Sequence, residues 1–302
     1  MIDAQDIVER AGELSLDPTV VEKDYVLGWL LAGISQHPEL GPNWVFKGGT
    51  CLKKVFFETY RFSEDLDFTL LAEEHVDEIF LARTLREVAE WVYREAGIEI
   101  PLDQIRVQVF QNPRGRPAAE ARVYYRGPLR PRGSLPRIKL DLTADERVVL
   151  GAAQLPISHP YRDRPADGIA VHCYPYAEVF AEKIRALGDR ARPRDLYDVV
   201  NLYRREEALE AAGNVREILA EKCAFKRIPV PTLAALEPTR EELAADWEHM
   251  LAHQLPSLPP FESFWGALPS FFAWLALRER LAAPEPYRMA PGEQVIRPAV
   301  GG

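Results

Sequence analysis

The residues best suited to chemistry lie in one stretch from Trp44 to Leu71, which contains the run F-S-E-D-L-D-F-T-L. Side chains alternate between the two faces of a strand, so Asp65 and Asp67 share one face about 7 Å apart along the chain. Two neighbouring carboxylates repel each other, and a bound divalent cation such as Mg²⁺ offsets that repulsion. An isolated D-x-D is more often solvated surface, but Leu66 and Phe68 behind the pair favour a metal platform.

A glycine turn precedes this acidic strand. Gly48 and Gly49 end a short apolar run, and glycines allow backbone N–H groups to approach a ligand closely. Thr50 is predicted to cap the helix that follows, whose N–H groups and positive dipole end would favour a phosphate. A Gly-Gly pair alone usually marks only a turn. The order of strand, turn, helix and acidic strand favours a phosphate site.

A later strand offers one more carboxylate. Three strand-like segments follow the acidic strand, around residues 105–111, 121–126 and 137–143. In the last of them, I-K-L-D-L-T places Lys139 and Asp141 on the face opposite Ile138, Leu140 and Leu142. If this strand pairs beside the D-L-D strand, Asp141 joins Asp65 and Asp67. One aspartate in a strand is weak evidence by itself.

The second half of the chain contains a candidate phosphate-binding lysine. A helix is predicted from Tyr176 to Leu187, closed by Gly188, and it carries Lys183. A flexible ammonium there could hold the β and γ phosphates of a nucleotide and the departing pyrophosphate. A single lysine is usually surface, but the adjoining run G-D-R-A-R-P-R-D-L-Y-D favours the functional interpretation. Its Arg192 and Arg194 are candidates for phosphate contacts.

These motifs together resemble those of the AbiEii/AbiGii and MenT-like nucleotidyltransferase toxins. The resemblance extends from about Val20 to Tyr203, in F-K-G-G-T-C-L, R-F-S-E-D-L-D-F, K-L-D-L, E-K-I-R-A-L and R-D-L-Y-D. It implies an α/β fold with a mixed nucleotidyltransferase sheet. On this basis we expect an N-terminal helical segment over 1–43, the nucleotidyltransferase core over 44–174 and a helical C-terminal domain over 175–302.

The resemblance also implies a reaction, namely nucleotidyl transfer from an NTP by a toxin that has a cognate antitoxin protein. The metals would be two Mg²⁺ ions, with Mn²⁺ as the alternative, held by Asp65, Asp67 and Asp141. The phosphates would lie on Gly48, Gly49 and Thr50, while Lys183 neutralises the pyrophosphate. Asp198 matches a family carboxylate and would orient Lys183 or Arg194. Arg61 and Ser63 flank the site without an assigned role, and Ser63 is counted with the nucleotide-binding candidates.

Composition limits the class of protein. With 302 residues, 47% of them hydrophobic, the chain is long enough for about two domains. Ser263 to Leu277 is too short to cross a bilayer, and the N-terminal M-I-D-A-Q-D lacks the features of a secretion signal. The three cysteines are widely separated, which predicts reduced thiols and no zinc cluster. We therefore expect a cytoplasmic protein.

The acceptor is the least determined part. A net charge of −9 disfavours nucleic acid, yet seven arginines against the single acid Glu120 lie between Arg114 and Arg137, together with Tyr124 and Tyr125. These rings could stack bases, or the segment could equally be a solvated hairpin. The first hypothesis is a tRNA 3′ end. The alternatives are a protein or small-molecule acceptor, and a nucleotide- or antitoxin-binding module without turnover.

The remaining elements are predicted to be structural. Helices are expected over 19–35 and 75–97, and Glu22-Lys23-Asp24-Tyr25 has the pattern of an ordinary charged first turn. Lys53 and Lys54 are expected to face solvent. Beyond residue 204 the chain has helical periodicity, with an apolar segment over 270–281 expected in the core and an extended tail after Ala283. His249 and His253 lack the glutamate of a zinc-protease motif.

Overall fold

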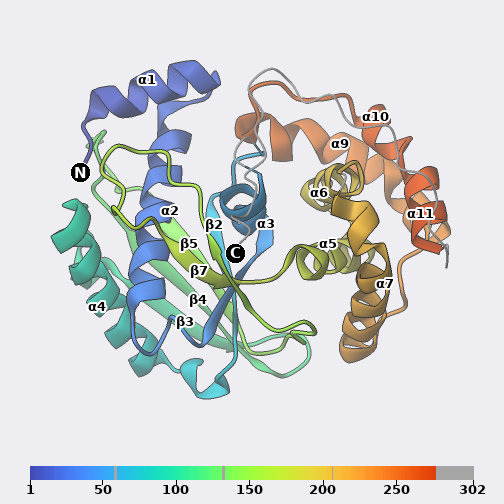
Figure 1. Ribbon diagram of the computed structural model, residues 1–302, viewed down its shortest axis with the longest axis horizontal. Coiled ribbons are helices and arrows are strands. Elements are labelled where there is room, and N and C mark those ends of the chain that lie inside the picture. The colour runs from blue at the N-terminus through green and yellow to red at the C-terminus, as the bar shows by residue number, and fades with distance from the viewer. Residues whose placement is uncertain (58–59, 131–132, 206, 277–302) are drawn as a thin grey trace. The chain divides into compact units, whose positions relative to one another are not determined.

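The computed structural model describes residues 1–57, 60–130, 133–205 and 207–276 (Figure 1). The chain divides into two compact units. The first contains residues 1–146 and 152–173, and the second contains 147–151 together with the described residues from 174 onward. The helices before residue 44 therefore group with the sheet.

The first unit is built on a seven-stranded sheet of order β3-β4-β5-β2-β1-β7-β6. β2 pairs with β5 and β1 with β7 in parallel, while the other neighbours are antiparallel. The predicted mixed sheet is thus confirmed. The strands are β1 (Trp44–Lys47), β2 (Asp65–Leu70), β3 (Arg106–Gln111), β4 (Pro117–Tyr124), β5 (Arg137–Thr143), β6 (Ala153–Pro156) and β7 (Ala170–Cys173).

Burial alternates along the central strands because successive side chains point to opposite faces. Leu66, Phe68, Leu140 and Leu142 are buried, whereas the acidic residues between them are half-buried. In Figure 1 helices lie over the sheet. They are α2 (Pro18–Gln36) and α4 (Glu78–Ala96), while α1 (Ala4–Leu14) packs against α2. The unit also contains the short 3₁₀ turns η2 (Glu73–His75) and η3 (Leu102–Gln104).

The segment after the glycine turn departs from the prediction. α3 (Gly48–Cys51) is only four residues long and continues into a π-helical turn, η1 (Leu52–Phe56). Lys47 stands at the N-cap, so the predicted cap at Thr50 is wrong. Lys53 and Lys54 are buried, at 6% and 1% exposure, so the expectation that they face solvent is also wrong. Their charge is compensated inside the protein by Asp24.

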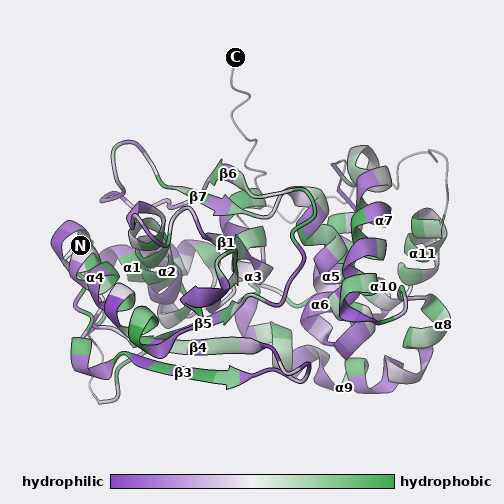
Figure 2. Ribbon diagram, turned by 90° about the horizontal axis from the view of Figure 1, so that it is seen from below, coloured by the Kyte–Doolittle hydropathy of each residue, from purple (hydrophilic) through white to green (hydrophobic). Residues whose placement is uncertain are grey.

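The second unit is helical in its described part, and Figure 2 shows polar and apolar stretches alternating along its helices. Gly188 does not end the first helix, which continues to Arg190 and has Ala191 as its left-handed C-cap residue. Gly188 instead packs against Pro231, where an added Cβ would lie 2.2 Å from the proline ring. The helices are α5 (Tyr176–Arg190), α6 (Pro193–Tyr203), α7 (Glu207–Lys226), α8 (Leu233–Leu236), α9 (Arg240–Leu251), α10 (Phe261–Trp265) and α11 (Leu268–Ala276), with 3₁₀ turns η4 (Glu237–Thr239) and η5 (Ala252–Gln254).

Several smaller expectations can be compared with the structure. Phe271, Trp274 and Leu275 of α11 are buried, as expected for a core segment, while the tail after Ala283 lies outside the described residues. Cys51, Cys173 and Cys223 are buried free thiols. Within the described ranges, the helices all lack the length or the apolarity that crossing a membrane requires.

Candidate active site

The acidic residues meet where β2 and β5 run side by side. The register pairs Asp67 with Asp141 and Asp65 with Lys139, which confirms the expected pairing of these two strands. Neighbouring strands lie about 4.8 Å apart, and residues in register point to the same face. Asp65, Asp67 and Asp141 therefore share one face of the sheet, and all three are half-buried.

Charged residues extend this row on both sides. Lys47 is in register with Asp67, and Glu120 is in register with Asp141. The ammonium of Lys139 lies 2.9 Å from Asp141 and 3.4 Å from Glu120. Lys47 and Glu120 were not among the candidates, since only the strand register, which the sequence does not reveal, brings them beside the aspartates.

Lys139 responds to this concentration of negative charge. Burial by itself lowers the pKa of Lys139, but the hydrogen bond to Asp141 and the charges of Asp141, Glu120 and Asp65 outweigh burial and raise it. Lys139 is thus firmly cationic at neutral pH. Because the ammonium of Lys139 lies against Asp141, the carboxylate face has room for a cation and attracts one.

The glycine turn packs directly against the acidic strand. Gly48 has φ +80°, and a Cβ added there would lie 2.1 Å from Oδ2 of Asp67. A Cβ on Gly49 would lie 2.6 Å from Nη2 of Arg61 and 3.1 Å from Oγ of Ser63. Both flanking residues therefore lie at the turn, although neither had an assigned role.

Thr50 ties the same turn to the acidic strand. Its hydroxyl donates to the carbonyl oxygen of Asp65 at 2.5 Å, and Thr50 is fully buried. The side chain is thus engaged with β2, so its backbone N–H is the group that could meet a ligand. The glycines, Thr50 and the aspartates form one rigid constellation.

The donor set fits a divalent metal. Mg²⁺ and Mn²⁺ are bound by oxygen ligands, and carboxylates from two adjacent strands supply them on one face. The missing side chain at Gly48 lets the backbone of the turn approach the carboxylate of Asp67 closely. The residues present are therefore suitable ligands for the ions that the sequence implied.

A second charged cluster lies wholly within the second unit. Lys183 is buried, with its ammonium 2.7 Å from Oδ2 of Asp198 and 3.5 Å from Oδ1 of Asp195. Arg190 pairs with Asp195 through two hydrogen bonds of 2.7 and 3.0 Å. The structure thus brings Asp198 to Lys183. Arg194 donates to the carbonyl oxygen of Met250.

The arginine-rich segment differs from the expected basic patch. Acids from elsewhere in the first unit pair with several of its arginines, namely Asp145 with Arg114, Glu73 with Arg116 and Glu99 with Arg126. Tyr125 is 1% exposed, so the idea that it stacks bases is wrong, whereas Tyr124 is half-exposed. Arg122 is in register with Lys139 and therefore faces the carboxylate row. Arg132 lies outside the described residues.

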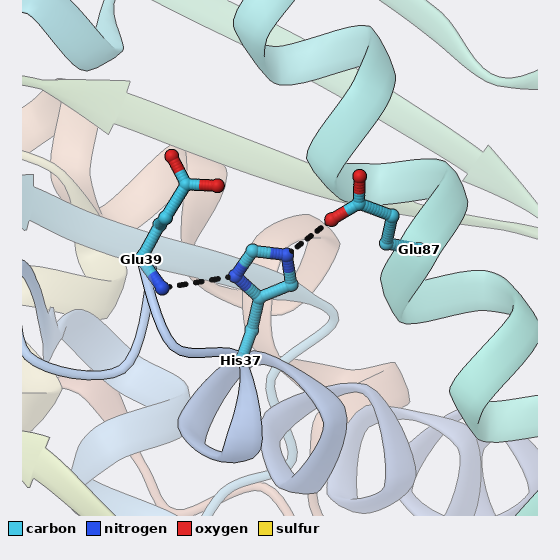
Figure 3. A group of neighbouring side chains, drawn as sticks. All are labelled: His37, Glu39 and Glu87. Carbon is cyan, nitrogen blue, oxygen red and sulfur yellow. Dashed lines mark hydrogen bonds and ion pairs between the residues drawn. The ribbon is translucent and has the colours of Figure 1, made fainter.

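A further group of possible metal ligands joins His37, Glu39 and Glu87 (Figure 3). Nε2 of His37 lies 2.7 Å from Glu87, and Nδ1 accepts from the backbone N–H of Glu39. Arg83 forms ion pairs with both glutamates at 2.9 and 3.1 Å. This group therefore already has its cation, and it is separate from the aspartate row. His249 and His253 are exposed.

The chain is similar to several known proteins. The family model described as nucleotidyl transferase AbiEii toxin, type IV TA system, matches residues 29–276. MenT4, a nucleotidyltransferase toxin from Mycobacterium tuberculosis, is 20% identical with a TM-score of 0.60, over 91% of this chain and 90% of that one. A putative nucleotidyltransferase from H. pylori is 16% identical with a TM-score of 0.51, over 86% and 96%. No curated protein matches the chain.

Proposed function

The chain belongs to the AbiEii family of nucleotidyltransferase toxins, and on that premise we propose that it transfers a nucleotide from an NTP to the 3′ end of a tRNA. In this reaction the 3′-hydroxyl oxygen forms a bond to the α-phosphorus. The bond from that phosphorus to the bridging oxygen breaks, and pyrophosphate leaves with the electron pair. In the product, the original terminal 3′-hydroxyl is esterified to the added nucleotide, so the tRNA no longer ends at the nucleotide that is aminoacylated.

The observation that carries the proposal is the register of β2 and β5, which sets Asp67 beside Asp141 on the face that also holds Asp65. In our proposal these three carboxylates hold two Mg²⁺ ions, or Mn²⁺. When bound, such ions polarise the acceptor hydroxyl and neutralise the triphosphate. Asp141 also accepts the proton of the hydroxyl, once Lys139 has moved from its carboxylate.

The remaining roles concern the phosphates. Backbone N–H groups of Gly48, Gly49 and Thr50 bind the triphosphate, with Ser63 at the edge of the turn. Lys183 offsets the negative charge that builds up on pyrophosphate, and Asp198 keeps its ammonium oriented. Arg194 is the additional candidate for a phosphate contact. A cognate antitoxin is the expected protein partner, and the cytoplasm remains the predicted location.

The acceptor part of the proposal rests on Arg122. This side chain lies in the row of Asp65 and Lys139 and forms an ion pair with Glu120 at 2.5 Å, while Arg126 pairs with Glu99. The two arginines therefore differ in their place relative to the carboxylates, and both have an acidic partner. A single-stranded 3′ end is narrow enough to reach a metal site and presents the required hydroxyl. Arg122 would contact its phosphates.

The test is incubation of total RNA with each labelled NTP and Mg²⁺, followed by 3′-end sequencing. We expect Arg122→Glu to reduce labelling of tRNA, while the matched charge reversal Arg126→Glu leaves it near the wild-type level. Equal effects of the two reversals would move the RNA surface away from Arg122. Label on protein and never on RNA would replace the tRNA acceptor by the protein acceptor.

A protein or small-molecule acceptor is the second candidate, and the ion-paired state of Arg114, Arg116 and Arg126 favours it by weakening the basic field. The third interpretation, a binding module without turnover, disagrees with the family to which the chain belongs.

A further inference from the structure

A buried carboxylate on α2 contacts the segment that follows the glycine turn. Asp24 is 3% exposed, and its Oδ2 lies 2.7 Å from the ammonium of Lys54, which also donates to the Asp24 carbonyl oxygen at 2.9 Å. The ammonium of Lys53 lies 3.5 Å from Oδ1. Tyr161 donates its hydroxyl hydrogen to Oδ2 at 3.0 Å. Two consecutive lysines of η1 thus meet one aspartate of another helix.

The lysines connect this aspartate mechanically to the glycine turn. η1 follows α3 without a break, so Lys54 is six positions from Gly48 in one continuous helical segment. The backbone of η1 is also held by Ser158, whose N–H donates to the Lys54 carbonyl oxygen at 2.6 Å. Because η1 is fixed at Lys54, the start of the same helical segment at Gly48 has little freedom to move.

The glycine turn itself also has little freedom to move relative to β2. Gly48 packs so closely against β2 that a Cβ added there would lie 2.1 Å from Oδ2 of Asp67, so α3 has little room to move toward that strand. A shift away would break the bond of Thr50 to Asp65. The turn is thus held against β2 by its own contacts, and η1 fixes the chain directly after it.

The anchor is strong because its charges are buried. Burial alone would raise the pKa of Asp24, but the charges and hydrogen bonds of Lys53, Lys54 and Tyr161 hold it well below the usual range. Removing one partner from a buried ion pair leaves the other charge uncompensated, which is more damaging than losing an exposed pair. Relaxation of η1 is the direct way for Lys54 to regain a partner or water.

We propose that Asp24 is a positioning residue for nucleotide transfer, which fixes η1 through Lys53 and Lys54 and so holds the Gly48–Thr50 turn at the correct distance from Asp65 and Asp67. The Glu22-Lys23-Asp24-Tyr25 run is thus more than a charged helical turn. This inference rests on the proposed function in so far as the turn binds the triphosphate.

The experiment compares Asp24→Asn with the control Asp163→Asn. Asp163 accepts a hydrogen bond at 2.7 Å from Tyr25, the neighbour of Asp24 on α2, and pairs with the N-terminal ammonium at 3.5 Å rather than with the lysines of η1. We expect the KM for NTP to rise about tenfold or more in Asp24→Asn, with a smaller change in the KM for the acceptor. Asp163→Asn should lower only the melting temperature.

A second measurement does not depend on activity. Hydrogen–deuterium exchange of peptides covering 48–56 should accelerate in Asp24→Asn, while peptides from β2 and β5 keep the wild-type rate. If the wild-type enzyme shows no transfer, the proposed function fails, and this exchange comparison still decides whether Asp24 positions the turn. If Asp24→Asn does not fold, Tyr161→Phe, which removes the hydroxyl contacts to Asp24 at 3.0 Å and to the Val21 carbonyl oxygen at 3.1 Å, should show the same changes at smaller size.

The outcomes are separable. A lower melting temperature with unchanged KM and unchanged exchange at 48–56 would make Asp24 merely structural and overturn the proposal. An equal rise in KM in Asp163→Asn would also overturn it, because that variant leaves the contacts to Lys53 and Lys54 intact. A rise in KM together with faster exchange, confined to the Asp24 and Tyr161 variants, supports it.

Discussion

At the scale of single residues, Asp67 carries the most direct prediction. Asp67→Asn should abolish transfer, because a two-metal site that loses one ligand loses several kcal/mol of transition-state stabilisation. It should not destabilise the fold, because it relieves repulsion among Asp65, Asp67 and Asp141. NTP-dependent labelling and thermal melting in Mg²⁺ and in EDTA measure both effects, with the exposed Asp246→Asn as control.

Thermal melting also tests whether Asp67 helps to bind Mg²⁺. Wild-type protein should melt at a higher temperature in Mg²⁺ than in EDTA, and Asp67→Asn should lose that difference. Full activity or an unchanged Mg²⁺ shift in the variant would remove Asp67 from the site.

Lys183 gives a prediction about stability that sequence reasoning could not make. Asp195 and Asp198 are fully buried, so Lys183→Met should destabilise the second unit by about 3–5 kcal/mol through uncompensated charge. Adding Asp198→Asn should restore part of that loss. Urea denaturation of the two single variants and the double variant measures the coupling, and additive effects would contradict the ion pair.

His159 predicts how stability depends on pH. Its ring packs against Tyr25, Trp29 and Tyr161, and neither ring nitrogen has a hydrogen-bond partner among the residues that the structure describes. Burial first, then the charge of Lys54, lowers the pKa of His159 to about 3, against an ordinary value of 6.5. The unfolded chain therefore binds the proton first, and stability present above pH 6.5 falls as the pH drops toward 3.

His159→Phe should remove that loss. The slope attributable to one proton is about 1.4 kcal/mol per pH unit at most, and it should disappear from urea titrations between pH 6 and 4. His249→Phe replaces an exposed histidine and should leave the slope unchanged. An identical slope in wild type and His159→Phe would show that other groups cause the acid sensitivity.

At the scale of elements, the α3 turn can be tested with two glycines. Gly48→Ala combines a φ of +80° with a Cβ only 2.1 Å from Asp67 and should abolish activity. Gly115→Ala has a similar φ of +71° but nothing within 4 Å, so it should lose only about 1 kcal/mol of stability and keep its activity. Comparable loss of activity in both would mean that backbone strain, rather than contact with Asp67, is responsible.

Helices and strands could be predicted from the sequence where the spacing of apolar residues determines them. The strand over 137–143 and the helix around 19–35 follow from alternation and helical periodicity, and both appear with nearly the expected bounds. The predicted end at Gly188 was wrong, because the helix continues to Arg190 and the left-handed cap position falls at Ala191, which is not a glycine. Gly188 instead packs against Pro231 from a distant segment. The third carboxylate was found through the family motif, whereas Lys47 and Glu120 needed the register.

Lys53 and Lys54 show why other parts were not predictable. Two adjacent lysines on a short helix look solvated in any local pattern, since nothing in the sequence pairs them with Asp24 thirty positions earlier. The ion pairs of the arginine-rich segment have the same origin, because Glu73, Glu99 and Asp145 all come from other segments. Charge pairing across the fold is a tertiary property.

At the scale of the whole molecule, the net charge of −9 governs any encounter with RNA. The cations in the row with Asp65 are Lys139, Arg122 and Arg106, so about three phosphates could be neutralised. For single strands, log K should then change with log salt concentration with a slope of about −2. Titrations of a tRNA 3′-end oligonucleotide at several salt concentrations measure it, and Arg122→Glu should flatten it.

The absence of any slope would leave no electrostatic basis for RNA as the acceptor. A slope much steeper than that of three contacts would point to a larger basic surface than the described residues of this row provide.

The parallel pairing of β2 with β5 also determines when the site comes into existence. Asp67 and Asp141 are neighbours in space but lie on strands between which α4, β3 and β4 intervene in the chain. Such distant contacts form late in folding, because a long loop must close before the pair is gained. During synthesis, a ribosome that has released β2 still holds a chain without its carboxylate cluster until β5 has emerged. The carboxylate cluster therefore cannot exist until close to half of the 302-residue chain has been made.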